Sequence, residues 1–146
     1  MWHELLKAAR SARKAHSGQV RKHGEPYFHH PMAVAAILWK QGHREISLLQ
    51  AAYLHDTLED TQLKPEDLRV GFGAEVERLV LAVTHQEGEE LEAYYHRIKA
   101  AGPDAVALKI ADRIHNESQL HLLPVDHPAH KKAAHKAALI ARILNI

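Results

Sequence analysis

Two histidines and two aspartates on separate segments of the chain are residue types that bind metal ions. They are His30, within residues 27–31, the adjacent pair His55 and Asp56, and Asp112. Imidazole nitrogens and carboxylate oxygens together suit a hard or borderline divalent cation. A lone His-Asp pair means little in a chain with 14 His. Four potential ligands on otherwise apolar segments, however, predict a site for one ion.

Two further acids, Glu59 and Asp60, follow the His-Asp pair by one helical turn. Residues four apart in a helix share a face, so Glu59 would lie above His55 and Asp60 above Asp56. The two acids would then sit beside the ion, where a general base or a water-orienting carboxylate belongs. The alternative is a helix end that carries solvated charges. Together with the four ligands, the acids predict a metal-dependent phosphohydrolase.

Asp112 interrupts the most apolar segment of the chain, residues 105–122. A buried carboxylate is unfavourable unless it is paired or bound to a cation. Lys109 and Arg113 offer an ion pair as the alternative to a metal. Asn116 lies four residues further on and shares the face of Asp112.

Helices must position these residues, because apolar residues recur at spacings of three and four almost throughout, and no two segments alternate as paired strands do. Serine, proline and glycine mark the expected ends. The first expected helix ends near residue 18. The others cover 31–42, 47 to about 60, 65–71, 74–84, 89–101, 103–122 and 128–144. We therefore predict an all-α bundle of seven or eight helices, in one domain that spans residues 1–146.

Composition narrows the class of protein. A net charge of +1 provides no field for binding nucleic acid or an anionic membrane. The absence of cysteine excludes disulfides and thiolate zinc sites. No stretch approaches the roughly 18 apolar residues of a membrane span, and the N-terminus does not have the pattern of a signal peptide. We expect a cytoplasmic protein, and the sequence leaves its oligomeric state open.

Six short motifs follow one another in order, at residues 15–22, 24–31, 52–61, 72–76, 83–84 and 109–116. In content and spacing they resemble the hydrolase domain of the RelA/SpoT family, particularly its small stand-alone alarmone hydrolases. The similarity runs from about residue 8 to about residue 120. It implies the helical bundle of an HD domain.

The resemblance also implies an activity. It is the hydrolysis of the 3′-pyrophosphate of guanosine tetra- or pentaphosphate to GDP or GTP and pyrophosphate, with one Mn²⁺. Carried over by position, His30, His55, Asp56 and Asp112 hold the metal, Glu59 and Asp60 serve the attacking water, and Arg21, Lys22 and Asn116 contact the nucleotide. Arg21 and Lys22 precede His30 closely in the chain, so their loop should run near the metal.

Two departures from the family pattern affect the expected substrate. Residues 85–92 are acidic where the family often carries Lys and Arg, and Glu117, Ser118 and Gln119 stand where an Arg is common. The same metal chemistry could therefore act on an adenosine alarmone or on the 2′-phosphate of NADPH. A non-catalytic helical domain that binds a nucleotide is the remaining alternative.

Overall fold

Most of the residues that the structure describes are helical. The computed structural model describes residues 1–144, which contain nine α-helices, one 3-10 helix (η1) and an isolated β-bridge between Val20 and Pro26. The elements are α1 (Trp2–Ala15), α2 (His29–Lys40), α3 (Ile46–Leu54), α4 (Thr57–Asp60), α5 (Pro65–Phe72), α6 (Ala74–Val83), α7 (Leu91–Ala101), α8 (Pro103–Ser118), η1 (Leu120–Leu122) and α9 (Pro128–Ile143). Of these α-helices, all except α4 have eight residues or more. The predicted all-α bundle is confirmed.

Proline and glycine set several helix boundaries. Pro65, Pro103 and Pro128 each occupy the first turn of a helix, where the missing N–H is not needed. Gly73 and Gly102 separate consecutive helices at φ values of 97° and 108°, a region that residues with a Cβ rarely adopt. These signals lie in the sequence itself, which explains why the boundaries were predictable.

The single helix predicted from Ser47 to about Asp60 is wrong. The segment begins one residue earlier, at Ile46, ends at Leu54, and resumes at Thr57 as the one-turn helix α4. The cause is local, because side chains take over two backbone acceptors. His55 Nδ1 lies 2.7 Å from the Ala52 carbonyl oxygen, and Thr57 Oγ1 donates to the Leu54 carbonyl oxygen at 2.7 Å. In an uninterrupted helix these carbonyls would accept from the N–H groups of residues 56 and 58.

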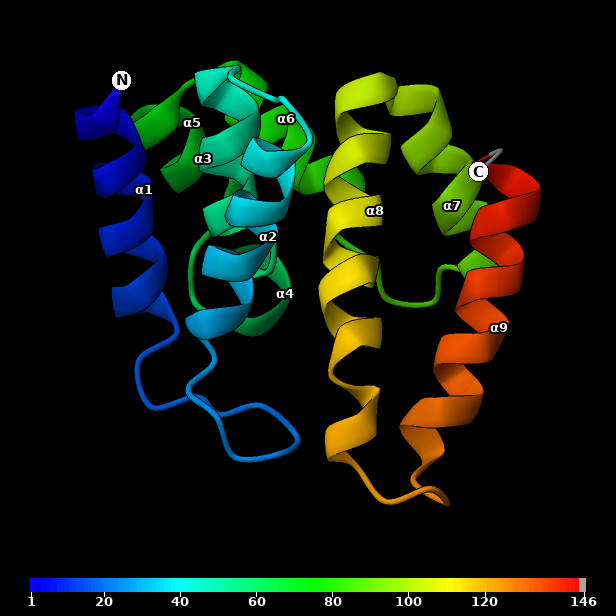
Figure 1. The fold of residues 1–146 in the computed structure, drawn as a ribbon. Coiled ribbons are helices and arrows are strands. Elements are labelled where there is room, and N and C mark those ends of the chain that lie inside the picture. The colour runs from blue at the N-terminus through cyan, green and yellow to red at the C-terminus, as the bar shows by residue number, and fades with distance from the viewer. Residues whose placement is uncertain (145–146) are drawn as a thin grey trace.

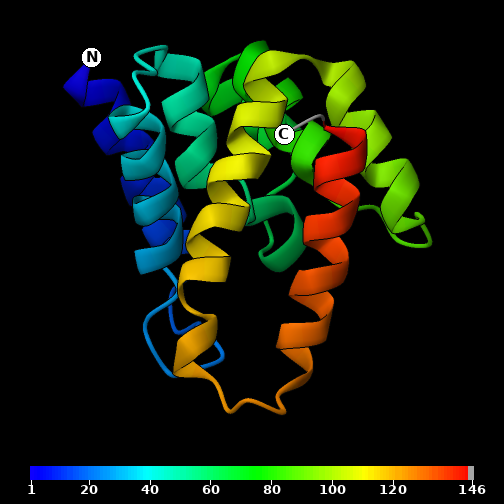
Figure 2. The same ribbon diagram turned by 45° about the vertical axis from the view of Figure 1, so that its right-hand side comes forward.

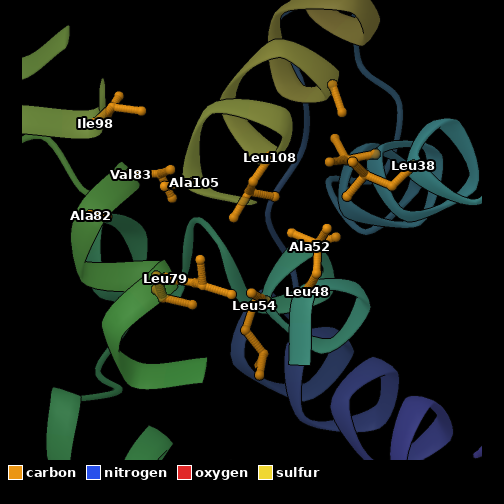
Figure 3. Close-up of a cluster of buried hydrophobic side chains, with 14 of the residues drawn as sticks. Leu38, Leu48, Ala52, Leu54, Leu79, Ala82, Val83, Ile98, Ala105 and Leu108 are labelled. Atoms are coloured by element: carbon orange, nitrogen blue, oxygen red, sulfur yellow. The ribbon is translucent and has the colours of Figure 1, made fainter. Parts of the chain in front are cut away.

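Helix α8 lies at the centre of the fold and contacts α2, α3, α6 and α7 (Figure 1). The core beside it is aliphatic. Leu38 of α2, Leu48 and Leu54 of α3, Leu79 of α6 and Leu108 of α8 are all fully buried and gather in one cluster (Figure 3). This packing fixes the position of α8, which carries Asp112, relative to α2, which carries His30, and to α3, which His55 and Asp56 follow.

Two segments flank the C-terminal part of α8 (Figure 1, Figure 2). The loop between α1 and α2 lies beside the end of α8, and α9 descends on the other side (Figure 1, Figure 2). Helix α9 packs against α7 through its C-terminal part. Among the residues that the structure describes, no helix is both long enough and apolar enough to span a bilayer.

Candidate metal centre

Four side chains converge where α2, α8 and the break between α3 and α4 meet. His30 comes from the first turn of α2, His55 and Asp56 from the break, and Asp112 from the middle of α8. One ligand atom from each of the four lies within 4.8 Å of the others. Contacts of α8 with α2 and of α2 with α3 hold the three segments together.

The distances within this group, hereafter the His/Asp cluster, are short. His30 Nε2 lies 2.8 Å from Asp112 Oδ1 and 3.6 Å from Asp56 Oδ2. His55 Nε2 lies 3.0 Å from Asp56 Oδ2 and 3.3 Å from Asp112 Oδ1. Two nitrogens and two oxygens therefore face one point, the mixed donor set expected for a hard or borderline cation.

One buried nitrogen in the cluster tests whether these residues fit a metal. His55 is 3% exposed, and its Nε2 forms no hydrogen bond with any described residue. Its other nitrogen, Nδ1, faces a backbone carbonyl, which can only accept, so the neutral ring carries its proton there. Nε2 faces the two carboxylates: burial opposes a charge on the ring, but the attraction of Asp56 raises the pKa of His55 and favours a proton on Nε2, and a metal ion would satisfy the Nε2 lone pair in place of that proton. The donor set fits a divalent ion.

Asp112 and Asp56 are held ionised by cationic neighbours. Burial opposes the charge of Asp112, but nearby Lys109 outweighs it and the pKa of Asp112 falls well below its ordinary value. Lys109 Nζ donates to Oδ2 of Asp112 at 3.0 Å. This ion pair therefore does not use Oδ1, which faces the cluster. Burial likewise opposes the charge of Asp56, and the attraction of His55 lowers the pKa of Asp56 below its ordinary value.

Two neighbours of the cluster were not recognised in the sequence. The Tyr27 hydroxyl donates to Asp56 Oδ2, and the Tyr27 ring lies 4.6 Å from the ring of His16. His115 Nδ1 lies 2.7 Å from His30 Nδ1. Both belong to motifs noted above, but neither has a residue type that marks such a role on its own.

Glu59 and Asp60 lie on α4, and with Asp56 they form a second group of oxygens within 4.8 Å of one another. Burial and then the nearby Asp56 carboxylate raise the pKa of Asp60. Burial also raises the pKa of Glu59, against the hydrogen bond that Glu59 accepts from the His85 N–H. Glu59 lines the cavity described next, whereas Asp60 is not among its lining residues.

A cavity of about 350 Å³ opens over the cluster. Arg21 and Lys22 from the α1–α2 loop line one side, together with Asn116 and Gln119. Arg21 Nη2 donates to Asn116 Oδ1 at 2.9 Å and to Gln119 Oε1 at 3.0 Å. The loop thus runs beside the cluster, and its guanidinium is held in place by α8 and the residue that follows it.

The opposite wall includes two lysines to which the sequence gave no role. Lys132 and Lys136 of α9 line the cavity, as does Arg113 of α8. Burial, followed by the positive charges of Arg113 and Lys109, lowers the pKa of Lys136. The two lysines lie four residues apart in a segment without a motif, so the sequence did not indicate a role for them. Only the position of α9 in the folded structure places them beside the cluster.

The acidic segment 85–92 contributes no lining residue to this cavity. Its Glu89 pairs instead with Arg97, with Arg97 Nε 2.8 Å from Glu89 Oε2. The side-chain hydrogen bond from Arg97 lowers the pKa of Glu89 to about 2.

Comparisons with known proteins identify the family of the chain. The family model described as HD domain matches residues 8–140. The chain is 40% identical over 125 residues to human guanosine-3′,5′-bis(diphosphate) 3′-pyrophosphohydrolase MESH1, covering 81% of this chain and 70% of the relative. It is 39% identical over 136 residues to a probable GTP pyrophosphokinase of Mycobacterium leprae, covering 87% of this chain but 17% of that protein.

A third relative is the guanosine-3′,5′-bis(diphosphate) 3′-pyrophosphohydrolase of Haemophilus influenzae, 41% identical over 79% of this chain and 18% of its own length. A solved structure described as a metazoan ortholog of SpoT that hydrolyzes ppGpp superposes with a TM-score of 0.83. It covers 97% of this chain and 84% of its own, and its 24% identity bears on the fold alone. The resemblance to the RelA/SpoT hydrolase domain is confirmed, and the chain belongs to the HD domain family.

Proposed function

We propose that this protein is a metal-dependent phosphohydrolase that removes the 3′-pyrophosphate from guanosine tetra- or pentaphosphate, giving GDP or GTP and pyrophosphate. The observation that carries the proposal is the convergence of His30, His55, Asp56 and Asp112 at the base of a cavity with cationic walls. We further propose that residues 1–146 work as one HD-type domain, which the match over residues 8–140 supports.

The four cluster residues would hold one ion, and Mn²⁺ suits their mixed nitrogen and oxygen donors. When bound, such an ion lowers the pKa of a water molecule and neutralises charge on a diphosphate. The burial of His30 and His55, which are 1% and 3% exposed, keeps competing bulk water away from two of the donors.

Glu59 is the proposed proton acceptor for the attacking water. It lines the cavity and lies within 4.8 Å of Asp56, and burial raises its pKa, which brings a carboxylate closer to the basicity that proton transfer needs. Water adds to the phosphorus bonded to O3′ as its proton passes to Glu59, the O3′–P bond breaks to release pyrophosphate, and O3′ takes up one proton to leave as a hydroxyl group. Asp60, which is adjacent but more exposed, would orient that water.

The cavity walls would bind the nucleotide. The guanidinium of Arg21 is planar and is held by hydrogen bonds to Asn116 and Gln119, so it can stack on a base. Lys22, Lys132 and Lys136 add point charges that suit phosphate groups. These cations favour a substrate with phosphates at two positions. An adenosine alarmone or the 2′-phosphate of NADPH would meet the same charges and is the second candidate.

The names of relatives support this choice in part. Human MESH1 and the Haemophilus influenzae protein are named as 3′-pyrophosphohydrolases of guanosine-3′,5′-bis(diphosphate). The Mycobacterium leprae protein is named a probable GTP pyrophosphokinase, and this chain spans 17% of it. The match to MESH1 extends over 70% of that protein and is therefore the more informative of the three.

Removal of one ligand tests the metal site directly. Asp56→Ala should lose both the bound Mn²⁺, measured as about one ion per chain in the native protein, and the hydrolytic activity. Asp126→Ala, at an exposed position outside the cavity lining, is the matched control and should keep both. If Asp56→Ala retained the metal and full activity, the assignment of the cluster would be wrong.

A further inference from the structure

His30 has two nitrogens with different surroundings. Nε2 faces the His/Asp cluster, 2.8 Å from Asp112 Oδ1. Nδ1 faces another imidazole nitrogen, His115 Nδ1, at 2.7 Å, and the two rings stack at 5.0 Å. Two facing imidazole nitrogens at this distance share one proton, because two protons would collide and none would leave two lone pairs opposed.

His55 offers an instructive contrast. Its Nδ1 faces the Ala52 carbonyl oxygen at 2.7 Å, a group that can only accept, so its tautomer is fixed whatever the cluster binds. The partner of His30 is an imidazole, which can either donate or accept. The tautomer of His30 is therefore set jointly with that of His115.

We propose that His115 is a positioning residue, which accepts the Nδ1 proton of His30 and thereby directs the Nε2 lone pair of His30 at the metal. This inference rests on the metal site proposed above. A ligand nitrogen must be unprotonated, so metal binding through Nε2 requires the proton of neutral His30 to lie on Nδ1. His115 must then carry its own proton on Nε2. Outer partners of this kind typically change metal affinity by about 10- to 100-fold.

Two substitutions separate this role from mere packing. His115→Phe keeps a ring against His30 but removes the acceptor, and it should weaken Mn²⁺ binding about 10- to 100-fold. His115→Asn can place its amide oxygen near the former Nδ1 position, and it should bind Mn²⁺ within about threefold of the native protein. His96→Phe, at an exposed position of α7, is the control for loss of a histidine and should leave Mn²⁺ binding unchanged.

The measurement is Mn²⁺ titration of the metal-free proteins, followed by the signal of free Mn²⁺ in electron paramagnetic resonance. Native-like binding by His115→Phe would overturn the proposal, as would equal weakening in the Phe and Asn variants. Since no nucleotide is present, a wrong substrate assignment does not affect the result. Failure of the native protein to bind Mn²⁺ would instead overturn the metal site and this inference together.

A spectroscopic measurement keeps the proposal testable if the Phe variant does not fold. Native protein with ¹⁵N-labelled histidine can be loaded with diamagnetic Zn²⁺ and its ring nitrogens assigned by nuclear magnetic resonance. We expect the proton on Nδ1 of His30 and on Nε2 of His115. A proton on Nδ1 of His115 in the loaded protein would contradict the proposal.

Discussion

Asp56 links the His/Asp cluster to the two acids of α4. It accepts from the Tyr27 hydroxyl, faces both histidines of the cluster, and shares a group of oxygens with Glu59 and Asp60. A carboxylate fixed in this way can serve as a ligand on one side and meet water-directing acids on the other. The division of labour between ligand and base is therefore testable residue by residue.

Glu59→Gln should keep the metal and lose rate, because the amide removes a proton acceptor and no ligand of the His/Asp cluster. General acid–base catalysis contributes roughly 10²- to 10⁴-fold, and kcat should fall on that scale. Steady-state kinetics with a parallel Mn²⁺ titration checks this, with Glu87→Gln, at an exposed position, as the control. Loss of the metal would make Glu59 a ligand, and a fall in kcat of less than about threefold would make it a surface acid.

Arg21→Ala should raise KM more than it lowers kcat, because a side chain that binds the base acts equally on the ground state and the transition state. The native guanidinium is already held by Asn116 and Gln119, so little ordering is needed when substrate binds. Kinetics with guanosine and adenosine alarmones measures the effect, and Arg10→Ala, on the exposed side of α1, is the control. An unchanged KM for both nucleotides would show that this loop does not read the substrate.

The site residues that could be predicted are those whose type is unusual for their surroundings in the sequence. Asp112 was conspicuous as a charge in an apolar helix, and His55 as a neighbour of three acids. His115, Tyr27 and Lys136 were not, because an imidazole, a phenol or an amine on a helix or loop has many ordinary uses. Their importance here depends on tertiary contacts between segments that are far apart in the chain.

Among the structural elements, the break between α3 and α4 is the one that positions His55 and Asp56 in the His/Asp cluster. Periodicity predicted a continuous helix, since the apolar pattern of residues 47–54 runs on without proline or glycine. The break depends on two side-chain hydrogen bonds to carbonyl groups. Such bonds compete locally with helix geometry, and hydrophobic patterning carries no information about them.

Thr57→Val tests whether the Thr57 hydroxyl stabilises the break, because it replaces a fully buried hydroxyl by a methyl group of similar size. The Leu54 carbonyl then loses the donor seen at 2.7 Å, and the free energy of unfolding should fall by about 1–3 kcal/mol. Mn²⁺ binding should also weaken, since the turn that holds two ligands relaxes. Urea denaturation and metal titration measure the two effects.

Thr57→Ser retains the hydroxyl and is the matched variant for that experiment. It should restore most of the stability and of the metal affinity. If Thr57→Val were as stable as the native protein, the hydroxyl would not be what stabilises the break.

For helix α9, the sequence pattern predicts the start of the helix and its buried face but not the direction of its lysines. Its start was predictable from Pro128, and its apolar positions Leu139, Ile140 and Ile143 are buried as a helix periodicity implies. The direction in which α9 presents Lys132 and Lys136 follows from its packing against α7. That contact joins two helices separated by the whole of α8, and no local signal reports it.

For the whole molecule, the helical class and the order of the elements were accessible from sequence, because capping residues and apolar spacing act locally. The central place of α8 was only implied by its apolar character. What the sequence alone left undetermined is the cavity, since its two walls come from the loop after α1 and from α9. The cationic character of both walls now favours a polyphosphorylated nucleotide despite the acidic segment 85–92.

The most direct test of this account is the action of the Mn²⁺-loaded protein on a panel of nucleotides, with every product identified by chromatography and mass. We predict that guanosine tetraphosphate gives GDP and pyrophosphate in equal amounts, and that Asp56→Ala gives neither. Adenosine alarmones and NADPH should be slower substrates. Release of orthophosphate from NADPH in preference to pyrophosphate from guanosine tetraphosphate, or no turnover of any nucleotide by protein that holds its metal, would contradict the account.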